Sequence, residues 1–285
     1  MSLRTLVLAT TVLALLGLAC NLPLIGAPPT PTPPPAELPP QPLPPEPLAS
    51  PTAEPPATTE AIPAEGPPEV ILILEPGPGS RMTSPLRVAG MADSTFEQHL
   101  LLQLVLDDGT EITASPVIIQ SELGTRGQFE GELAFSVAGE RNALLQVLSS
   151  SPRDGGITHL ASVGVTLAPT GPVQVQPAGP HFESLQITAP QAGDTASGGI
   201  VHVEGIGLAS FEGNLVIEVY DEQGNLIGSM PVLVDAPDIG LPGPFRADVP
   251  YSLAAAGFGR ISVVDPLPAF DGLGHLASVE VRLLP

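Results

Sequence analysis

The pentapeptide His-Leu-Ala-Ser-Val occurs twice in the chain, at residues 159–163 and again at residues 275–279. Aligned backwards from it, the two segments share further residues at an offset of 114 to 116 positions: Pro76 with Pro190, Gly90 with Gly205, Phe96 with Phe211, and Phe129 with Phe245. A repeat this long is a whole domain, because solenoid units recur every ~20–50 residues. The sequence therefore predicts two tandem copies of one domain.

Short runs of Val, Ile and Leu alternate in each copy with clusters of Gly, Pro, Asp and Asn, a pattern typical of β-strands. Strands are expected near residues 70–74, 85–91, 99–106, 111–119, 128–136, 142–149 and 157–167. The second copy repeats them near 184–189, 199–207, 213–220, 225–235, 244–251, 258–264 and 274–283. Seven strands in about 100 residues predict an immunoglobulin-like β-sandwich, so the fold class is all-β. The expected domains are residues 69–168 and 183–285, joined by a linker rich in Pro and Gly at 169–182.

Alternating side chains indicate which residues form the core. In the second copy Leu215, Ile217 and Val219 are expected to point inward. In the first copy Leu101 and Val105 stand in the outward register although both are apolar. We therefore expect another domain, a partner or a long loop to cover these two residues. Their counterparts in the second copy, Val216 and Tyr220, are expected to be better suited to solvent.

Several motifs of the second copy support a family resemblance. They are Ile-Thr-x-Pro-x-x-Gly-Asp at 187–194, Gly205, Phe-Glu-Gly-Asn at 211–214, Gly-Pro-Phe at 243–245, and the His-Leu start of the last strand at 275–276. This set resembles the bacterial spore-germination immunoglobulin-like domain, a module often found beside GerM modules. The resemblance implies an extracytoplasmic β-sandwich with a binding or scaffolding role. It implies no catalytic residues, and the chain departs from the usual arrangement in containing no GerM-like segment.

The first twenty residues have the features of an export signal. Arg4 is followed by an apolar run at 6–18, and Cys20, the only cysteine, comes directly after it. This end resembles the signal peptide of a bacterial lipoprotein, which implies lipidation at Cys20 and anchoring of an extracytoplasmic protein to the cell membrane. An uncleaved membrane anchor is the alternative, but the run is shorter than the ~20 residues of a spanning helix.

Residues 21–68 contain 19 prolines and predict a disordered tether. As an extended polyproline II segment, they would hold the domains up to ~150 Å from the membrane. A Pro-rich ligand for a partner's groove is the alternative. The formal net charge of −21 excludes nucleic acid as a natural partner, which leaves an unknown envelope protein or polymer.

No catalytic constellation and no cofactor motif is found, so we expect a protein that is not an enzyme. His159 and His275 are expected at the edge of a core, bonded to backbone, with metal ligation as the alternative. Candidate binding residues lie in loops at one end of the second domain: Phe211, Glu212, Asp238, Asp265, Leu267, Phe270 and Asp271. Several carboxylates at that end could form a calcium site, but solvated acidic loops are the preferred interpretation because no EF-hand or tandem Asp-x-Asp spacing is present, so no metal ligand is predicted.

The predicted function is a lipid-anchored, extracytoplasmic binding or scaffolding protein of the bacterial cell envelope. The alternatives are an accessory subunit or domain of a secreted envelope enzyme, and a mechanical spacer. A cleft between the domains lined by His or carboxylates would favour the enzyme-linked alternative. Flat sandwiches with depressions only at the loop ends would favour binding.

Overall fold

A computed structural model describes residues 67–285, apart from 180–181, 209–211 and 239. The predicted signal peptide, Cys20 and nearly all of the predicted tether lie outside the described residues. Within the described part, no helix is both long and apolar enough to cross a membrane.

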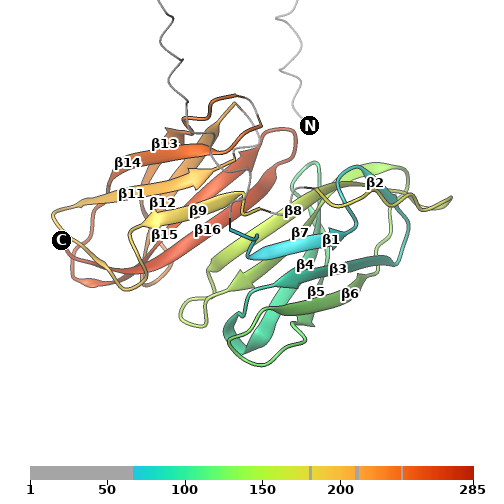
Figure 1. The fold of residues 1–285 in the computed structure, drawn as a ribbon, viewed down its shortest axis with the longest axis horizontal. Helices are drawn as coiled ribbons and strands as arrows, with labels where there is room; N and C mark the ends of the chain where they lie inside the picture. Colours follow the sequence, from blue (N-terminus) through green and yellow to red (C-terminus); the bar gives the residue numbers. More distant parts are fainter. Residues whose placement is uncertain (1–66, 180–181, 209–211, 239) are drawn as a thin grey trace, which may run out of the picture. The chain divides into compact units, whose positions relative to one another are not determined.

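The first sandwich consists of a small and a large sheet (Figure 1). The small sheet has the order β1 (Ile71–Glu75), β3 (Leu86–Ala92), β6 (Gly127–Leu133). The large sheet has the order β5 (Glu111–Ile118), β4 (His99–Leu106), β7 (Arg141–Ser150), β8 (Ile157–Leu167). A short strand, β2 (Ser80–Met82), pairs in parallel with β8, and a single 3₁₀ turn, η1 (Phe96–Gln98), precedes β4.

The second sandwich repeats this arrangement. Its small sheet has the order β14 (Gly243–Pro250), β11 (Ile200–Gly207), β9 (Leu185–Ala189). Its large sheet has the order β13 (Leu226–Leu233), β12 (Asn214–Asp221), β15 (Gly257–Leu267), β16 (Gly272–Leu283), with β10 (Thr195–Ala196) parallel to β16.

The all-β prediction is confirmed, with one addition to each sandwich. All fourteen expected strands are present within a few residues of their predicted bounds, and β2 and β10 are extra. These two strands have three and two residues, so they are too short to show an alternating pattern in the sequence.

Each sandwich closes its own hydrophobic core. Leu215, Ile217 and Val219 are fully buried in the second core, as the alternation predicts. Close packing against a phenylalanine ring explains why both repeats have a glycine at the aligned positions 90 and 205. A Cβ at Gly90 would lie 2.4 Å from the Phe129 ring, and one at Gly205 would lie 2.2 Å from the Phe245 ring. In both repeats the Phe ring therefore packs on a backbone that must carry no side chain.

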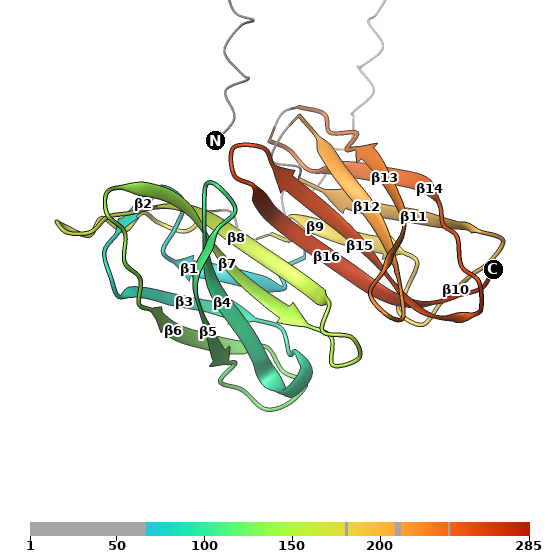
Figure 2. The same cartoon turned by 180° about the vertical axis from the view of Figure 1, so that it is seen from behind.

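The two large sheets join edge to edge. Strand β16 pairs antiparallel with β8, so that eight strands follow one continuous path from β13 to β5 (Figures 1 and 2). Part of the linker is also held to the first sandwich. The Arg81 guanidinium donates to the backbone oxygens of Thr170 and Pro172 at 2.9 and 2.7 Å, and Gln174 forms a β-bridge with Arg81.

Candidate functional site: the junction of the two sandwiches

The repeated pentapeptides pair with each other at the junction. His275 lies opposite Ala161, Leu276 opposite Leu160, and Ala277 opposite His159. The same three residues of each repeat therefore form both sides of the contact, as in the isologous interface of a twofold homodimer. A β-bridge between Pro68 and Phe182, the residues that precede the first strand region of each repeat, obeys the same pseudo-twofold relation.

An apolar row crosses the continuous sheet on the face turned away from the two sandwich cores. Eight directly opposed residues form it, one from each strand: Pro116, Leu101, Leu148, Leu160, Leu276, Val264, Val216 and Pro231. The four central residues, contributed equally by the two repeats, are 1–6% exposed and form a third hydrophobic cluster. This cluster lies at the junction itself and stabilises it through burial.

Prolines occupy both ends of the row. Pro116 lies in β5 and Pro231 in β13, the two outermost strands of the continuous sheet. Proline has no backbone N–H, so it cannot complete a hydrogen-bonded ladder with an added strand. The sheet therefore blocks its two outer edges, while the unblocked edges of β8 and β16 are used to join the repeats.

A Glu–His pair crosses the junction in each direction. Glu183 of the second repeat lies 3.4 Å from His159 Nε2 of the first, and Glu69 of the first lies 3.3 Å from His275 Nε2 of the second. Both Glu side chains are less than 10% exposed. The histidines were expected to bond to backbone, and that expectation was wrong, because an equivalent glutamate in the opposite repeat reaches each ring.

Asp265 extends the second of these pairs. It is fully buried and its Oδ2 lies 3.9 Å from His275 Nδ1. Burial works against the imidazolium, but hydrogen bonding and charge from Asp265 and Glu69 outweigh it and raise the pKa of His275 to about 9. His275 is therefore a cation at neutral pH, held between two carboxylates.

Two hairpins reach across the junction, each onto the sheet of the other repeat. We call the contacts of the β7–β8 hairpin the charged lobe. There, buried Arg260 of β15 pairs with Asp154 and donates to Ile157 O at 3.3 Å, and Arg153 pairs with Glu280 at 3.0 Å. Burial raises the pKa of Asp154, but the Gly156 N–H and the Arg260 charge outweigh it and lower that pKa overall.

The contacts of the β15–β16 hairpin form the neutral lobe. Gly272 lies over Leu144, so close that a Cβ on Gly272 would be 3.0 Å from a Leu144 methyl. Gln146 Nε2 donates to Leu273 O at 2.9 Å. Leu144 and Arg260 occupy equivalent positions of the two repeats, and the two lobes therefore place different chemistry on the same backbone contacts.

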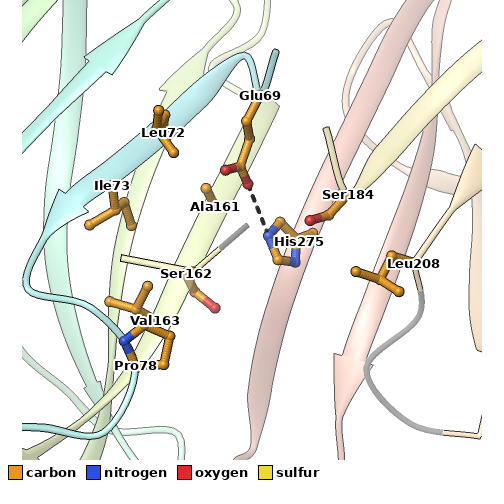
Figure 3. Close-up of a pocket in the computed structure, with 11 residues that line it drawn as sticks. Glu69, Leu72, Ile73, Pro78, Ala161, Ser162, Val163, Ser184, Leu208 and His275 are labelled. Carbon is orange, nitrogen blue, oxygen red and sulfur yellow. Dashed lines mark ion pairs between the residues drawn. The ribbon is translucent and has the colours of Figure 1, made fainter. Parts of the chain in front are cut away.

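A cavity of about 180 Å³ lies beside the Glu69–His275 pair (Figure 3). Its remaining lining is mostly apolar and comes from β1, the loop after β1, β8, the linker, and the residues just before β9 and just after β11. These residues are Leu72, Ile73, Pro78, Ala161, Ser162, Val163, Gly179, Ser184 and Leu208. The sequence reasoning did not find this cavity or its glutamates. The sequence did contain a signal for the glutamates: Glu69 and Glu183 are separated by the repeat offset of 114 residues, and each comes just before the first strand of its repeat.

The predicted interface residues lie on the outward face of β4. Leu101 is partly buried and packs against the junction cluster, and Val105 is 8% exposed and lies opposite Leu144. Val216 packs against the same cluster, so the expectation that it suits solvent was wrong. Tyr220 is partly buried and donates to Glu218 at 2.7 Å.

The predicted binding loops are not all available at the surface. Glu212 and Asp238 are exposed, whereas Asp265 is buried in β15 and was wrongly placed on a loop surface. Leu267 and Phe270 are partly buried. Asp271 is exposed, but its N–H lies 3.4 Å from Asp107 O in the first sandwich. Phe211 lies outside the described residues.

A calcium site finds no support in the described part of the chain. There, no cluster of three or more His, Cys, Asp or Glu side chains has an arrangement that could hold a metal ion. The ionisable groups of the junction pair with one another instead.

A family model described as the immunoglobulin-like domain of bacterial spore germination matches the chain twice, over residues 70–156 and 184–268. The chain belongs to this family. Its two spore-germination-type domains coincide with the two sandwiches, and each match ends just before the last strand, β8 or β16. No curated protein matches the chain.

The solved structures that match the chain are distant from it in sequence. Dimeric latent PorU from Porphyromonas gingivalis is 11% identical with a TM-score of 0.23, covering 76% of this chain and 24% of PorU. Bovine butyrophilin is 14% identical with a TM-score of 0.22, covering 74% of this chain and 97% of butyrophilin. The N-terminal Ig1-2 module of the Drosophila receptor protein tyrosine phosphatase DLAR is 12% identical with a TM-score of 0.23, covering 77% of this chain and 100% of the module. The chain thus spans about a quarter of the length of PorU.

Proposed function

We propose that the chain is a non-catalytic binding or scaffolding protein of the bacterial cell envelope, anchored outside the cytoplasm by a lipid on Cys20. The observation that supports this most is the junction. Its buried His, Glu, Asp and Arg side chains pair across the contact and join two immunoglobulin-like domains through one sheet. Such a pair presents its exposed loops in a fixed relation, which favours recognition because little ordering entropy is lost on binding.

The anchor is tested by replacing Cys20 with Ser. A lipidated Cys20 predicts that the wild-type chain partitions with membranes and carries an acyl modification by mass spectrometry. The Cys20→Ser variant should then be released or misprocessed while the melting temperature of the sandwiches is unchanged. Equal membrane partition of both proteins, with an unmodified Cys20, would refute the anchor.

The binding role is tested by photo-crosslinking in the native envelope. A photoreactive residue at Glu212 or Asp238, both exposed in loops of the second domain, should crosslink to one defined protein or polymer. A probe at Glu132, exposed on the small sheet of the first domain, is the control. Equal, diffuse labelling from all three positions would contradict a specific binding role for these loops.

An accessory role in an envelope enzyme is the second candidate, and one observation favours it. The cavity between the domains is lined by a histidine and a glutamate, Glu69 and His275. His275 Nε2 is paired with Glu69, so this nitrogen is not free to act as the base that activates a nucleophile. The pair therefore favours an accessory role over catalysis by this chain itself. Co-purification of a hydrolytic or transferase activity with the tagged chain, lost on junction mutation, would support this role over the first.

A further inference from the structure

A groove of about 550 Å³ lies on the outer face of the small sheet of the second sandwich. It crosses β11 and β14, two of the three strands that Figure 1 shows side by side, and reaches the end of β13. Exposed apolar side chains contribute to its lining, since Ile206 in β11 is 43% exposed and Leu233 in β13 is 65% exposed. The volume falls in the range of small-ligand sites, ~300–1,000 Å³.

The groove contains a guanidinium without a counter-charge. Arg246 of β14 is exposed, lines the groove and lies directly opposite Glu204 of β11. Glu204 instead contacts His202 Nε2 at 2.9 Å, and Asp248 contacts Nδ1 of the same ring at 2.7 Å. Hydrogen bonds to Glu204 and to Asp248 raise the pKa of His202. None of the described carboxylates forms an ion pair with Arg246, so this side chain is available to an anionic ligand.

An unpaired carboxylate lies beside that arginine. The N–H of Asp235 donates to Pro244 O at 2.8 Å, which holds Asp235 against the outer edge of β14. Arg246 is two residues further along β14, so Asp235 and Arg246 are diagonal neighbours with Cα atoms ~7–8 Å apart. Within the part of the chain that the structure describes, neither side chain forms an ion pair. The groove thus presents one anion and one cation on either side of Pro244.

The first sandwich carries neither charge at the equivalent positions. Gln120 stands where the second repeat has Asp235, and Glu130 stands where it has Arg246. The backbone contact is nevertheless the same, because the Gln120 N–H donates to Gln128 O at 2.7 Å. The two opposite charges therefore belong to the second repeat alone, on a backbone that folds without them.

We propose that this groove binds a short peptide with free termini. The α-carboxylate of the peptide pairs with Arg246 and its ammonium with Asp235, and an apolar side chain packs against Ile206 and Leu233. The volume sets the length, because about 550 Å³ is room for roughly 18 waters at ~30 Å³ each, which accommodates a tripeptide of small residues. The site goes beyond the proposed function, since it requires neither a lipid on Cys20 nor a macromolecular partner at the loops.

The direct test compares three forms of the tripeptide Ala-Leu-Ala on the full chain in detergent. Calorimetry should show saturable binding of the form with free termini. The C-terminal amide should bind at least fivefold more weakly because it has no carboxylate for Arg246, and the N-acetyl form at least threefold more weakly because it has no ammonium for Asp235. Equal affinity for the free peptide and either blocked form, or no saturable binding of the free peptide, would overturn the proposal. Specific crosslinks from Asp238 without peptide binding would strike the groove alone and leave the proposed function standing.

Matched substitutions locate the two charge contacts. Arg246→Gln should weaken binding of the free peptide at least fivefold and leave binding of the amide unchanged, because the amide already lacks the carboxylate. Arg282→Gln removes the same charge from an exposed residue of β16 outside the groove, and it should leave peptide binding within twofold. Asp235→Gln introduces the residue that the first repeat carries at this position and should weaken binding at least threefold. Equal losses from Arg246→Gln and Arg282→Gln would show a general effect of net charge and would overturn the site.

Discussion

The charged lobe and the neutral lobe share one backbone arrangement but differ in their side chains. In both, a glycine of the crossing hairpin lies on a residue of the opposite sheet, Gly156 on Arg260 and Gly272 on Leu144. In both, the next residue of the hairpin accepts a side-chain hydrogen bond through its carbonyl. The centre of the junction, where the pentapeptides meet, is the same in the two repeats. The duplicated interface has therefore kept an apolar centre and diverged at its periphery.

This divergence at the periphery makes the junction favour pairing of a first repeat with a second repeat over pairing of two like repeats. If two first repeats paired, Asp154 would face Leu144, and if two second repeats paired, Arg260 would face Phe270, the residue equivalent to Asp154. Either arrangement would lose the Arg260–Asp154 pair: Asp154 would face an apolar side chain, and Arg260 would keep only Glu280 of its own repeat, at 3.6 Å. Only the pairing of a first with a second repeat joins Arg260 to Asp154. The charges thus favour the pairing within one chain over pairing of like repeats.

The largest effect should follow from breaking the charged lobe. Arg260 is 4% exposed at its side chain, and Arg260→Leu removes the cation paired with the Asp154 carboxylate, which is 11% exposed and then keeps the Gly156 N–H as a donor at 3.0 Å. The substitution should lower the free energy of unfolding by roughly 3–5 kcal/mol. Combining it with Asp154→Phe converts this lobe to the pattern of the neutral lobe and should restore at least half of the loss. Arg87→Leu is the control in urea denaturation, since Arg87 is 69% exposed and its pair should contribute less than ~1 kcal/mol.

Alkaline pH should weaken the junction next most. The pKa of His275 rises from 6.5 to about 9 on folding, so the folded protein holds a proton that the unfolded chain has lost between these values. The stabilisation is complete below pH 6.5 and disappears as pH rises through about 9, a change of up to about 3 kcal/mol. Denaturation at intervals from pH 6 to 10 should show this fall, and His275→Gln should remove it. A wild-type profile that is flat over this range would contradict the assignment.

The centre of the junction should respond symmetrically. Leu160→Ala and Leu276→Ala remove directly opposed side chains that are 1% and 6% exposed, and each should cost about 2–3 kcal/mol. Because the two side chains are opposed on neighbouring strands, the double variant should cost less than the sum of the single ones. Leu226→Ala, at a residue 53% exposed, serves as the control and should have little effect. Strict additivity would show that the two leucines do not interact in solution.

The smallest effect is expected at Leu101 and Val216, the residues next to the two ends of the apolar row. Leu101→Gln and Val216→Gln alter equivalent, partly buried residues that pack against the junction cluster, and each should cost about 1 kcal/mol. Limited proteolysis of the linker at 169–182 should become faster in both variants. A response of Leu101→Gln alone would show that the cluster depends more on the first repeat than on the second.

The sequence predicted the repeated unit more completely than it predicted the site. The apolar alternation of Leu215, Ile217 and Val219 was sufficient to assign the core, because a strand has only two faces and a buried face must be apolar. The same alternation could not show what covers Leu101, since the outward register is compatible with a partner, a loop or a second domain. Asp265 was misplaced for a related reason: a Pro-rich hairpin suggests a loop, but β15 continues through it to Leu267.

By itself, then, the sequence determined that one all-β unit is duplicated, where its strands run and which residues fill each core, because these properties depend on side-chain period and local turn chemistry. Only the tertiary structure decided that the two pentapeptides pair with each other. A free strand edge accepts any partner with a compatible register, and no local pattern specifies which one. The roles of Glu69 and Glu183 were likewise settled by long-range packing, which brings each glutamate to a histidine 206 or 24 residues away in the chain.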